Sequence, residues 1–125
     1  MAATFFENTA YVLVKRNQFR VRHIESNAEV LLDAQPPFST TRLLIGQFLA
    51  AESLLKRALK QVSKSGFFSV SPKVVIQPLE MTDGGLSEVE ERVLREVAIG
   101  AGASKVVVWV GPQLTDEEVK AKVNE

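Results

Sequence analysis

The residues that could carry acid–base or metal chemistry are few in this sequence. His23 is the single histidine, and there is no cysteine, which excludes disulfides, thiol catalysis and cysteine-based zinc sites. His23 stands beside Arg22 and near Glu25, with no nucleophile at a recognisable spacing, so we expect a surface residue and not a base. We therefore predict no catalytic residue, no bound metal and no cofactor.

Two glycine-containing segments could be mistaken for phosphate-binding loops. Gly84-Gly85 precedes an expected helix, but the segment lacks the lysine of a P-loop, so it is an anion-site candidate without that motif. The run of residues 100–103, Gly-Ala-Gly-Ala, follows a helix instead of opening one. No helix N-terminus would then face an anion, so this run predicts a helix end.

Two helix starts are marked by capping boxes. Ser87 is followed three residues later by Glu90, and Thr115 is followed three residues later by Glu118. In such a box the glutamate hydrogen-bonds back to the chain at the helix start. Glu90 therefore has a structural reason to be present without any chemistry.

Hydrophobic periodicity defines the elements around these residues. Alternating apolar residues predict a hairpin with its turn near 16–18, and a third short strand ends before Pro36-Pro37. Apolar residues at three- and four-residue spacing predict a long helix that is capped by Ser39, Thr40 or Thr41 and ends at Gly66. The later elements are strands over 73–76 and 105–110, the second of them buried on both faces, and helices over 87–100 and from 115 onward.

The element order is therefore βββαβαβα over one domain, residues 1–125. Three hairpin-connected strands followed by alternating helices and strands predict an α/β (α+β) fold, one mixed sheet with helices on its faces. The same order occurs in the ribonuclease H-like fold, which actin uses in each lobe; this likeness of topology carries no function by itself.

A family resemblance comes from the segment Val89 to Val106, which closely resembles a stretch of MreB, the rod shape-determining bacterial actin homologue. Arg42 to Val62 resembles the long helix before that stretch, and Ser71 to Val75 resembles the Ser-Pro-Arg-Val strand of the family. The resemblance extends over nearly the whole chain and implies the first lobe of an actin-like ATPase.

Departures from the family pattern bear on activity. The family's first hairpin carries an Asp-Leu-Gly-Thr turn that holds phosphate and magnesium, whereas residues 11–17 have neither the aspartate nor the glycine. Trp109 to Pro112 stands in place of a Glu-Glu-Pro sequence, and the family's second-lobe motifs have no counterpart. Glu90 matches the glutamate that positions the attacking water in the family, although the capping box already explains it.

We therefore expect a non-enzymatic, MreB-like protein-interaction domain, linked to bacterial cell shape or filament regulation. The alternative is a nucleotide-binding or hydrolysing protein whose site is completed by an oligomer or a partner chain. A ribonuclease H-like nuclease would need several converging acidic residues, which the strands at 11–14 and 73–76 lack.

Partners are predicted to be proteins or further copies of the chain. Two aromatic pairs, Phe5-Phe6 and Phe67-Phe68, are the candidate interaction residues. Fifteen basic residues balance fifteen acidic ones, so no net charge attracts nucleic acid or an anionic membrane. The longest apolar run, Val106 to Val110, is too short to span a bilayer, and no secretory signal is recognisable, so we expect a cytoplasmic protein without a transmembrane segment.

Overall fold

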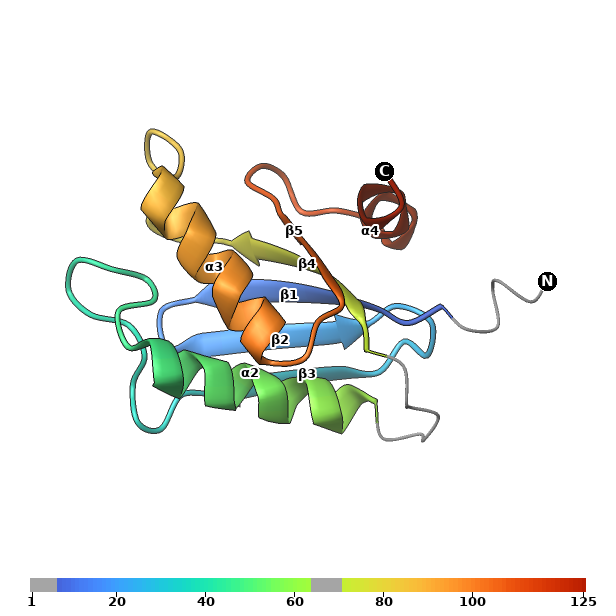
Figure 1. Ribbon diagram of the computed structural model, residues 1–125, viewed down its shortest axis with the longest axis horizontal. Coiled ribbons are helices and arrows are strands. Elements are labelled where there is room, and N and C mark those ends of the chain that lie inside the picture. Colours follow the sequence, from blue (N-terminus) through green and yellow to red (C-terminus); the bar gives the residue numbers. More distant parts are fainter. Residues whose placement is uncertain (1–6, 64–70) are drawn as a thin grey trace.

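One mixed sheet organises the part of the chain that the computed structural model describes, residues 7–63 and 71–125 (Figure 1). Within these residues five strands lie in the order β3-β2-β1-β4-β5. Their bounds are β1 Thr9–Lys15, β2 Gln18–His23, β3 Glu29–Asp33, β4 Lys73–Pro78 and β5 Lys105–Val108. The first three strands pair antiparallel, and β4 pairs parallel to both β1 and β5.

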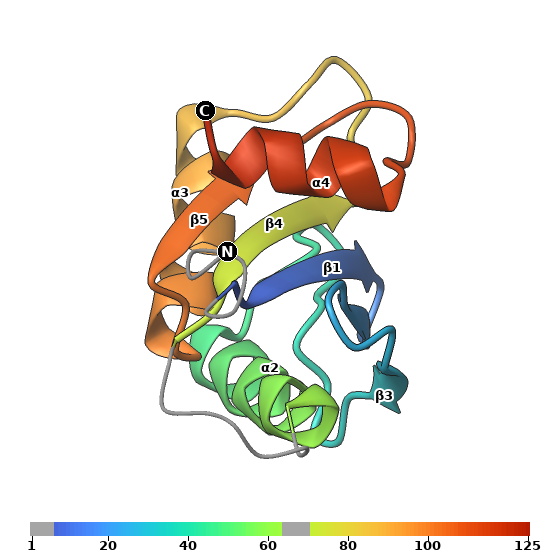
Figure 2. The ribbon, with the colours of Figure 1, turned by 90° about the vertical axis from the view of Figure 1, so that its right-hand side faces the viewer.

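The helices of the described residues are α2 Phe48–Val62, α3 Glu88–Gly100 and α4 Asp116–Val123. Figure 2 shows α2 and α4 on opposite sides of the sheet. The element order is the predicted βββαβαβα, and the mixed α/β architecture is consistent with a single actin-like lobe.

Strand β1 lies at the centre of the sheet and is covered on both faces. Because side chains alternate along a strand, Val12 and Val14 point into the larger core, which α2 and α3 cover. Tyr11 and Leu13 point to the other face, where they share a smaller core with Val119 of α4. The loops that follow β1 and β4 are therefore held by the most deeply buried part of the molecule.

The start of α2 differs from the prediction. The helix begins at Phe48, and its N-cap residue Gln47 makes no side-chain capping hydrogen bond. Ser39, Thr40 and Thr41 lie in the preceding loop, so their prediction as helix caps was wrong. Apolar residues of that loop, such as Ile45, join the core without being helical, which extended the apolar spacing backward beyond the helix.

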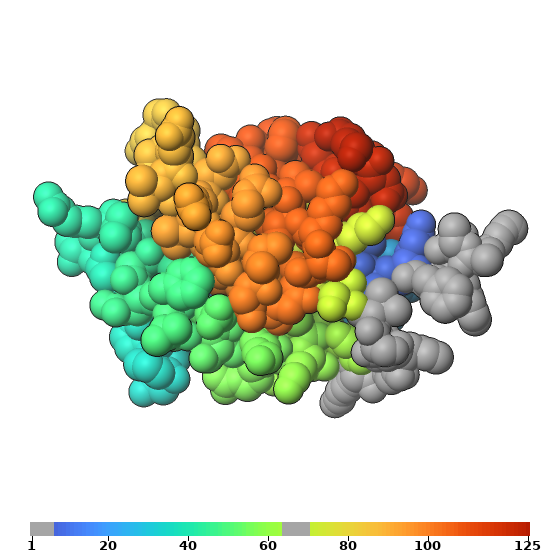
Figure 3. Space-filling model, viewed as in Figure 1, coloured from blue at the N-terminus to red at the C-terminus, as the bar shows by residue number. Residues whose placement is uncertain are grey.

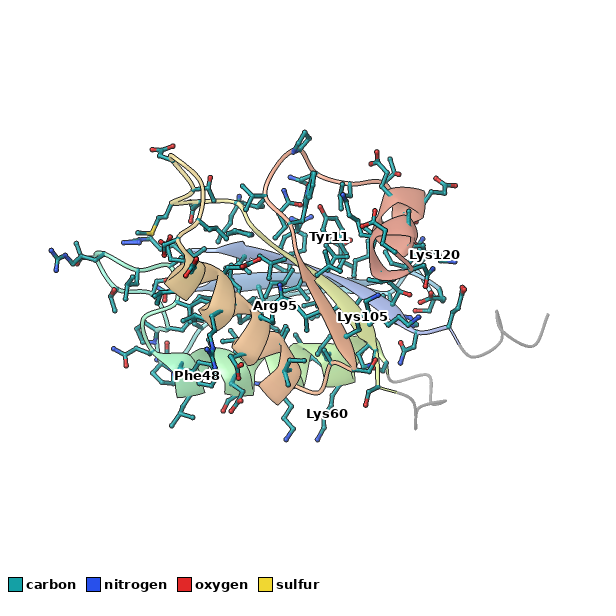
Figure 4. The ribbon with its side chains drawn as sticks, turned by 45° about the horizontal axis from the view of Figure 1, so that its top comes forward. Tyr11, Phe48, Lys60, Arg95, Lys105 and Lys120 are labelled. Carbon is teal, nitrogen blue, oxygen red and sulfur yellow. The ribbon has the colours of Figure 1, made fainter. Side chains whose placement is uncertain are left out.

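Strand β5 is packed on both faces, as predicted, by α3 on one side and α4 on the other, but it is only partly buried because it lies at the edge of the sheet. It pairs only with β4 and ends at Val108; Val106 is buried, whereas Val107 and Val108 are half-buried. The Arg95 side chain of α3 donates a hydrogen bond to the Val106 carbonyl (2.8 Å), and Figure 4 labels this arginine beside the strand. Arg95 thus covers one backbone acceptor of an edge that could otherwise pair with another chain.

Candidate functional site

Three loops meet where β1 and β4 end. Arg16 lies in one of these loops and contacts the other two. It stands in the β1–β2 turn, where its backbone N–H donates to Glu80 Oε1 (2.6 Å) in the β4–α3 loop. Its guanidinium donates to the Thr40 carbonyl (2.9 Å) in the β3–α2 loop and approaches the Met81 sulfur (3.4 Å).

Asn17 holds the β3–α2 loop in place. Its side-chain oxygen accepts from the backbone N–H groups of Phe38 (2.9 Å) and Ser39 (2.7 Å). Its φ of 56° is in the left-handed region, which asparagine tolerates better than most residues. Phe38 is buried and stacks on Phe19 with ring centroids 4.8 Å apart. The sequence shows only a turn-forming asparagine here; its long-range partners, 21 and 22 residues away, give no sequence signal.

The predicted capping box at the start of α3 is confirmed. The Glu90 carboxylate accepts from the Ser87 N–H (2.8 Å), and the Glu90 N–H donates to Ser87 Oγ (3.1 Å). The matching box of Thr115 and Glu118 opens α4. Gly84 and Gly85 have φ values of 79° and 87°, so this glycine pair provides the backbone conformation of the loop before the box.

An apolar groove lies between the β3–α2 loop and the first turns of α3; we call it the α3 groove. Leu43, Met81 and Val89 form its exposed rim, and Ile45 and Leu94 are buried at its floor. Its cavity volume is about 70 Å³. The groove combines residues from two loops and a helix, which sequence periodicity cannot bring together.

The opposite face of the sheet carries a buried hydrogen-bond network around Tyr11, which Figure 4 labels. The Tyr11 hydroxyl donates to the side-chain oxygen of Gln77, and it accepts from the Leu114 N–H (3.0 Å). The Gln77 amide donates to the Gly111 carbonyl (2.6 Å). Burial raises the pKa of Tyr11, only partly offset by the Leu114 N–H. The network connects the β5–α4 loop to the sheet, so its role is structural.

His23 is buried, so its prediction as a surface residue was wrong. Its Nδ1 lies 2.7 Å from Ser26 Oγ, and its Nε2 lies 2.7 Å from Asn8 Oδ1. Burial lowers the pKa of the imidazole, whereas the nearby Glu25 carboxylate raises it. The imidazole thus joins the start of β1 to the β2–β3 turn.

The other predicted residues have structural surroundings where they are described. The run of residues 100–103 ends α3, with Ala101 as its C-cap and Gly102 at a φ of 119°, as predicted for a helix end. The Trp109 indole N–H donates to the Pro112 carbonyl (2.8 Å), and the Lys122 ammonium lies 4.0 Å from the ring centroid. The two phenylalanine pairs at 5–6 and 67–68 lie outside the described residues.

In residues 7–63 and 71–125, no group of three or more histidine, aspartate or glutamate side chains is placed to hold a metal ion. No helix in the same ranges has both the length and the apolar character needed to cross a membrane.

Comparison with known proteins places the chain in a family. The uncharacterized protein YjaA of Escherichia coli (strain K12) is 44% identical over 100 residues, which are 76% of this chain and 77% of YjaA. The chain belongs to the YjaA family. No protein-family model matches it.

The comparisons also show a distant relationship to MreB. The cell shape-determining protein MreB of Pasteurella multocida is 38% identical over 69 residues, and that of E. coli (strain K12) is 36% identical over 69 residues. These matches cover 55% of this chain, less than the nearly complete coverage that the motifs predicted, and 18% and 19% of the two MreB proteins. The chain is thus distantly related to MreB over about half of its length.

Proposed function

We propose that this chain is a non-enzymatic, MreB-related interaction domain that binds proteins involved in determining bacterial cell shape. The distant MreB relationship supports the choice of partners. Two features at the end of β1 and β4 support the non-enzymatic role: the contacts of Arg16 and the capping position of Glu90.

The hydrogen bond from the Arg16 N–H to Glu80 carries the proposal. In the resembling family, backbone amides of the β1–β2 turn hold phosphate. Here a carboxylate of the same chain already accepts that turn's N–H, at 2.6 Å. A phosphate at this position would have to displace Glu80 and would then lie beside a second negative charge.

The surroundings of Glu90 agree with this interpretation. The Glu90 side chain already accepts the Ser87 N–H, so placing an attacking water would cost the helix part of its cap. The α3 groove beside it, at about 70 Å³, is far below the 300–1,000 Å³ typical of ligand pockets. The α3 groove is therefore too small to enclose a nucleotide.

An ATP titration tests the non-enzymatic part of the proposal. A site with a Kd one hundredth of the ATP concentration would stabilise the native state by about 2.7 kcal/mol, raising the melting temperature by several degrees. We expect millimolar ATP with magnesium to leave the melting temperature unchanged. A dose-dependent rise would favour a nucleotide site and would overturn this part.

Sedimentation velocity tests the interaction part. The chain is run alone over a range of concentrations and then mixed with purified E. coli MreB. We expect a faster-moving complex in the mixture. If MreB and the chain sediment independently at every concentration, the proposed partnership is wrong.

A further inference from the structure

The α3 groove is the place where exposed apolar surface gathers on the described part of the chain. Val89 is 72% exposed, Leu43 45% and Met81 39%, and all three line the same groove. In Figure 3 the loop before α2 and the start of α3 lie at the left of the visible face. A contiguous apolar patch with a buried floor is typical of an interaction surface, whereas single exposed apolar residues are ordinary.

The charges around the groove are mainly negative. The charged residues among those that line it are Glu80 and Glu90. The segment 79–91, which forms one side, has five acidic residues and no lysine or arginine. The Arg16 guanidinium reaches Met81 at the rim, and Arg42 precedes Leu43 on the other side. Acidic groups thus outnumber basic ones on the α3 side, which favours a basic partner.

The groove also restricts the backbone of its occupant. Its walls are side chains of α3 and of two loops, and the strand beneath them, β4, pairs with β1 and β5 on both sides. No free sheet edge is therefore available there for an extended peptide, whose N–H and C=O groups would stay unpaired over apolar surface. A helix satisfies its own backbone hydrogen bonds and can present apolar side chains at i, i+3 and i+4.

A second copy of the chain does not supply such a helix from its described residues. Of the large apolar side chains, α2 exposes Leu49, α3 exposes Val89 and Ile99, and α4 exposes none. The two exposed residues of α3 are ten positions apart, so none of these three helices has an unpartnered apolar stripe. Within residues 7–63 and 71–125, no helix of a second copy fits the groove, which favours a different protein as the partner.

We propose that the α3 groove binds an amphipathic helix of another protein, with its apolar stripe against Leu43, Met81 and Val89 and with lysine or arginine facing the start of α3. This rests on the proposed function, an interaction domain, and adds the chemical class of the partner. The apolar stripe provides affinity, and the acidic segment 79–91 fixes the orientation of the helix.

Selection from a random 16-residue peptide library displayed on phage tests this chemistry with the full chain as bait. We expect the enriched peptides to carry apolar residues at helical spacing together with lysine or arginine. Circular dichroism of the purified peptides should show helix gained on binding. A selection that enriches nothing, or only acidic or extended sequences, overturns the proposal.

One exposed valine and one exposed leucine provide a matched pair of variants. Val89 is the second residue of α3 and is 72% exposed; Leu49 is the second residue of α2, is 73% exposed and does not line the groove. Val89→Ser should weaken binding of an enriched peptide by about tenfold or more, the effect of losing a central contact. Leu49→Ser should bind as the parent does. Equal effects of the two variants would contradict a site at the groove.

The charge requirement has its own variant. Glu88→Gln, in the first turn of α3, should weaken binding more at low than at high ionic strength, because salt screens exposed charges. If Glu88→Gln binds as the parent does at every salt concentration, the proposal that the partner helix carries lysine or arginine facing α3 is wrong. Failure of all peptide binding while ATP leaves the melting temperature unchanged would refute the groove assignment and leave the proposed non-enzymatic function in place.

Discussion

His23 links two parts of the chain that are separate in the fold. Its two ring nitrogens lie 2.7 Å from Asn8 and Ser26, at the start of β1 and in the β2–β3 turn. The Glu25 carboxylate, 3.6 Å from Nε2, accepts the Thr9 N–H (2.7 Å). Burial of this cluster outweighs the Glu25 charge, so folding lowers the pKa of the imidazole.

This pKa shift predicts a pH dependence of stability. Between the lowered folded pKa and the ordinary value of 6.5, the unfolded chain binds more protons than the folded one. The contribution of His23 to stability is therefore complete above about pH 6.5 and declines as the pH falls toward the folded pKa. Urea unfolding between about pH 7.5 and 5.5 should show this loss.

His23→Gln is the control, since it keeps a polar side chain but does not titrate. The difference in unfolding free energy between the parent and this variant should shrink as the pH falls through that window. Because His23 is the single histidine, its imidazole signals in proton NMR give the folded pKa directly. A midpoint at or above 6.5 would contradict the assignment.

At the scale of elements, the β3–α2 loop depends on one asparagine. Asn17 accepts two backbone N–H groups and occupies a left-handed conformation. Asn17→Gly keeps the conformation and loses the two hydrogen bonds, which should cost about 1–3 kcal/mol. Asn17→Ala loses the same hydrogen bonds and also disfavours the left-handed conformation, which should cost about 1–2 kcal/mol more. Urea unfolding measures both changes.

The comparison of the two variants separates the causes. If Asn17→Ala and Asn17→Gly have the same stability, the left-handed conformation contributes nothing measurable. If neither variant loses stability, the side-chain hydrogen bonds do not hold the loop. Because this loop carries Leu43 and Ile45, loss of its anchor should also reduce peptide binding at the α3 groove.

Local sequence signals account for most of the elements but for little of the candidate site. The hairpin, the order of helices and strands, and both capping boxes follow from periodicity and from residues three positions apart. The start of α2 could not be predicted, because Asn17 holds the preceding loop from 21 residues away. The burial of His23 and the α3 groove likewise depend on contacts between separate elements. The match to MreB was recognisable from residues 89–106, whereas its extent was overestimated.

At the scale of the whole molecule, the covering of the sheet is uneven. α2 and α3 pack on one face, and α4 contacts β1, β4 and β5 on the other. The outer face of β2 and β3 stays accessible, where Leu31 is 49% exposed and Arg20 pairs with Glu29 (3.2 Å). The sheet thus has a fully enclosed centre at β1 and a thinly covered edge at β3.

This difference predicts an order of hydrogen-exchange protection. The amides of Val12 and Val14 in β1 lie between two strands and two covered faces, so they should exchange only when the whole domain unfolds. The Ala34 N–H donates to the Asn17 carbonyl, and the alternation of an antiparallel pair then directs the Val30 and Leu32 amides toward β2 as well. These edge amides are hydrogen-bonded, so a difference from β1 reports opening of β3 and not a missing bond.

Native-state hydrogen exchange followed by NMR tests the order. The exchange free energies of Val12 and Val14 should equal the global unfolding free energy from urea. Val30 and Leu32 should exchange at least about tenfold faster, a difference of about 1.4 kcal/mol, because β3 can separate from β2 without exposing the core under β1. Equal protection of the four amides would show that the edge and the centre open only together. The uneven covering of the sheet would then have no consequence for its dynamics.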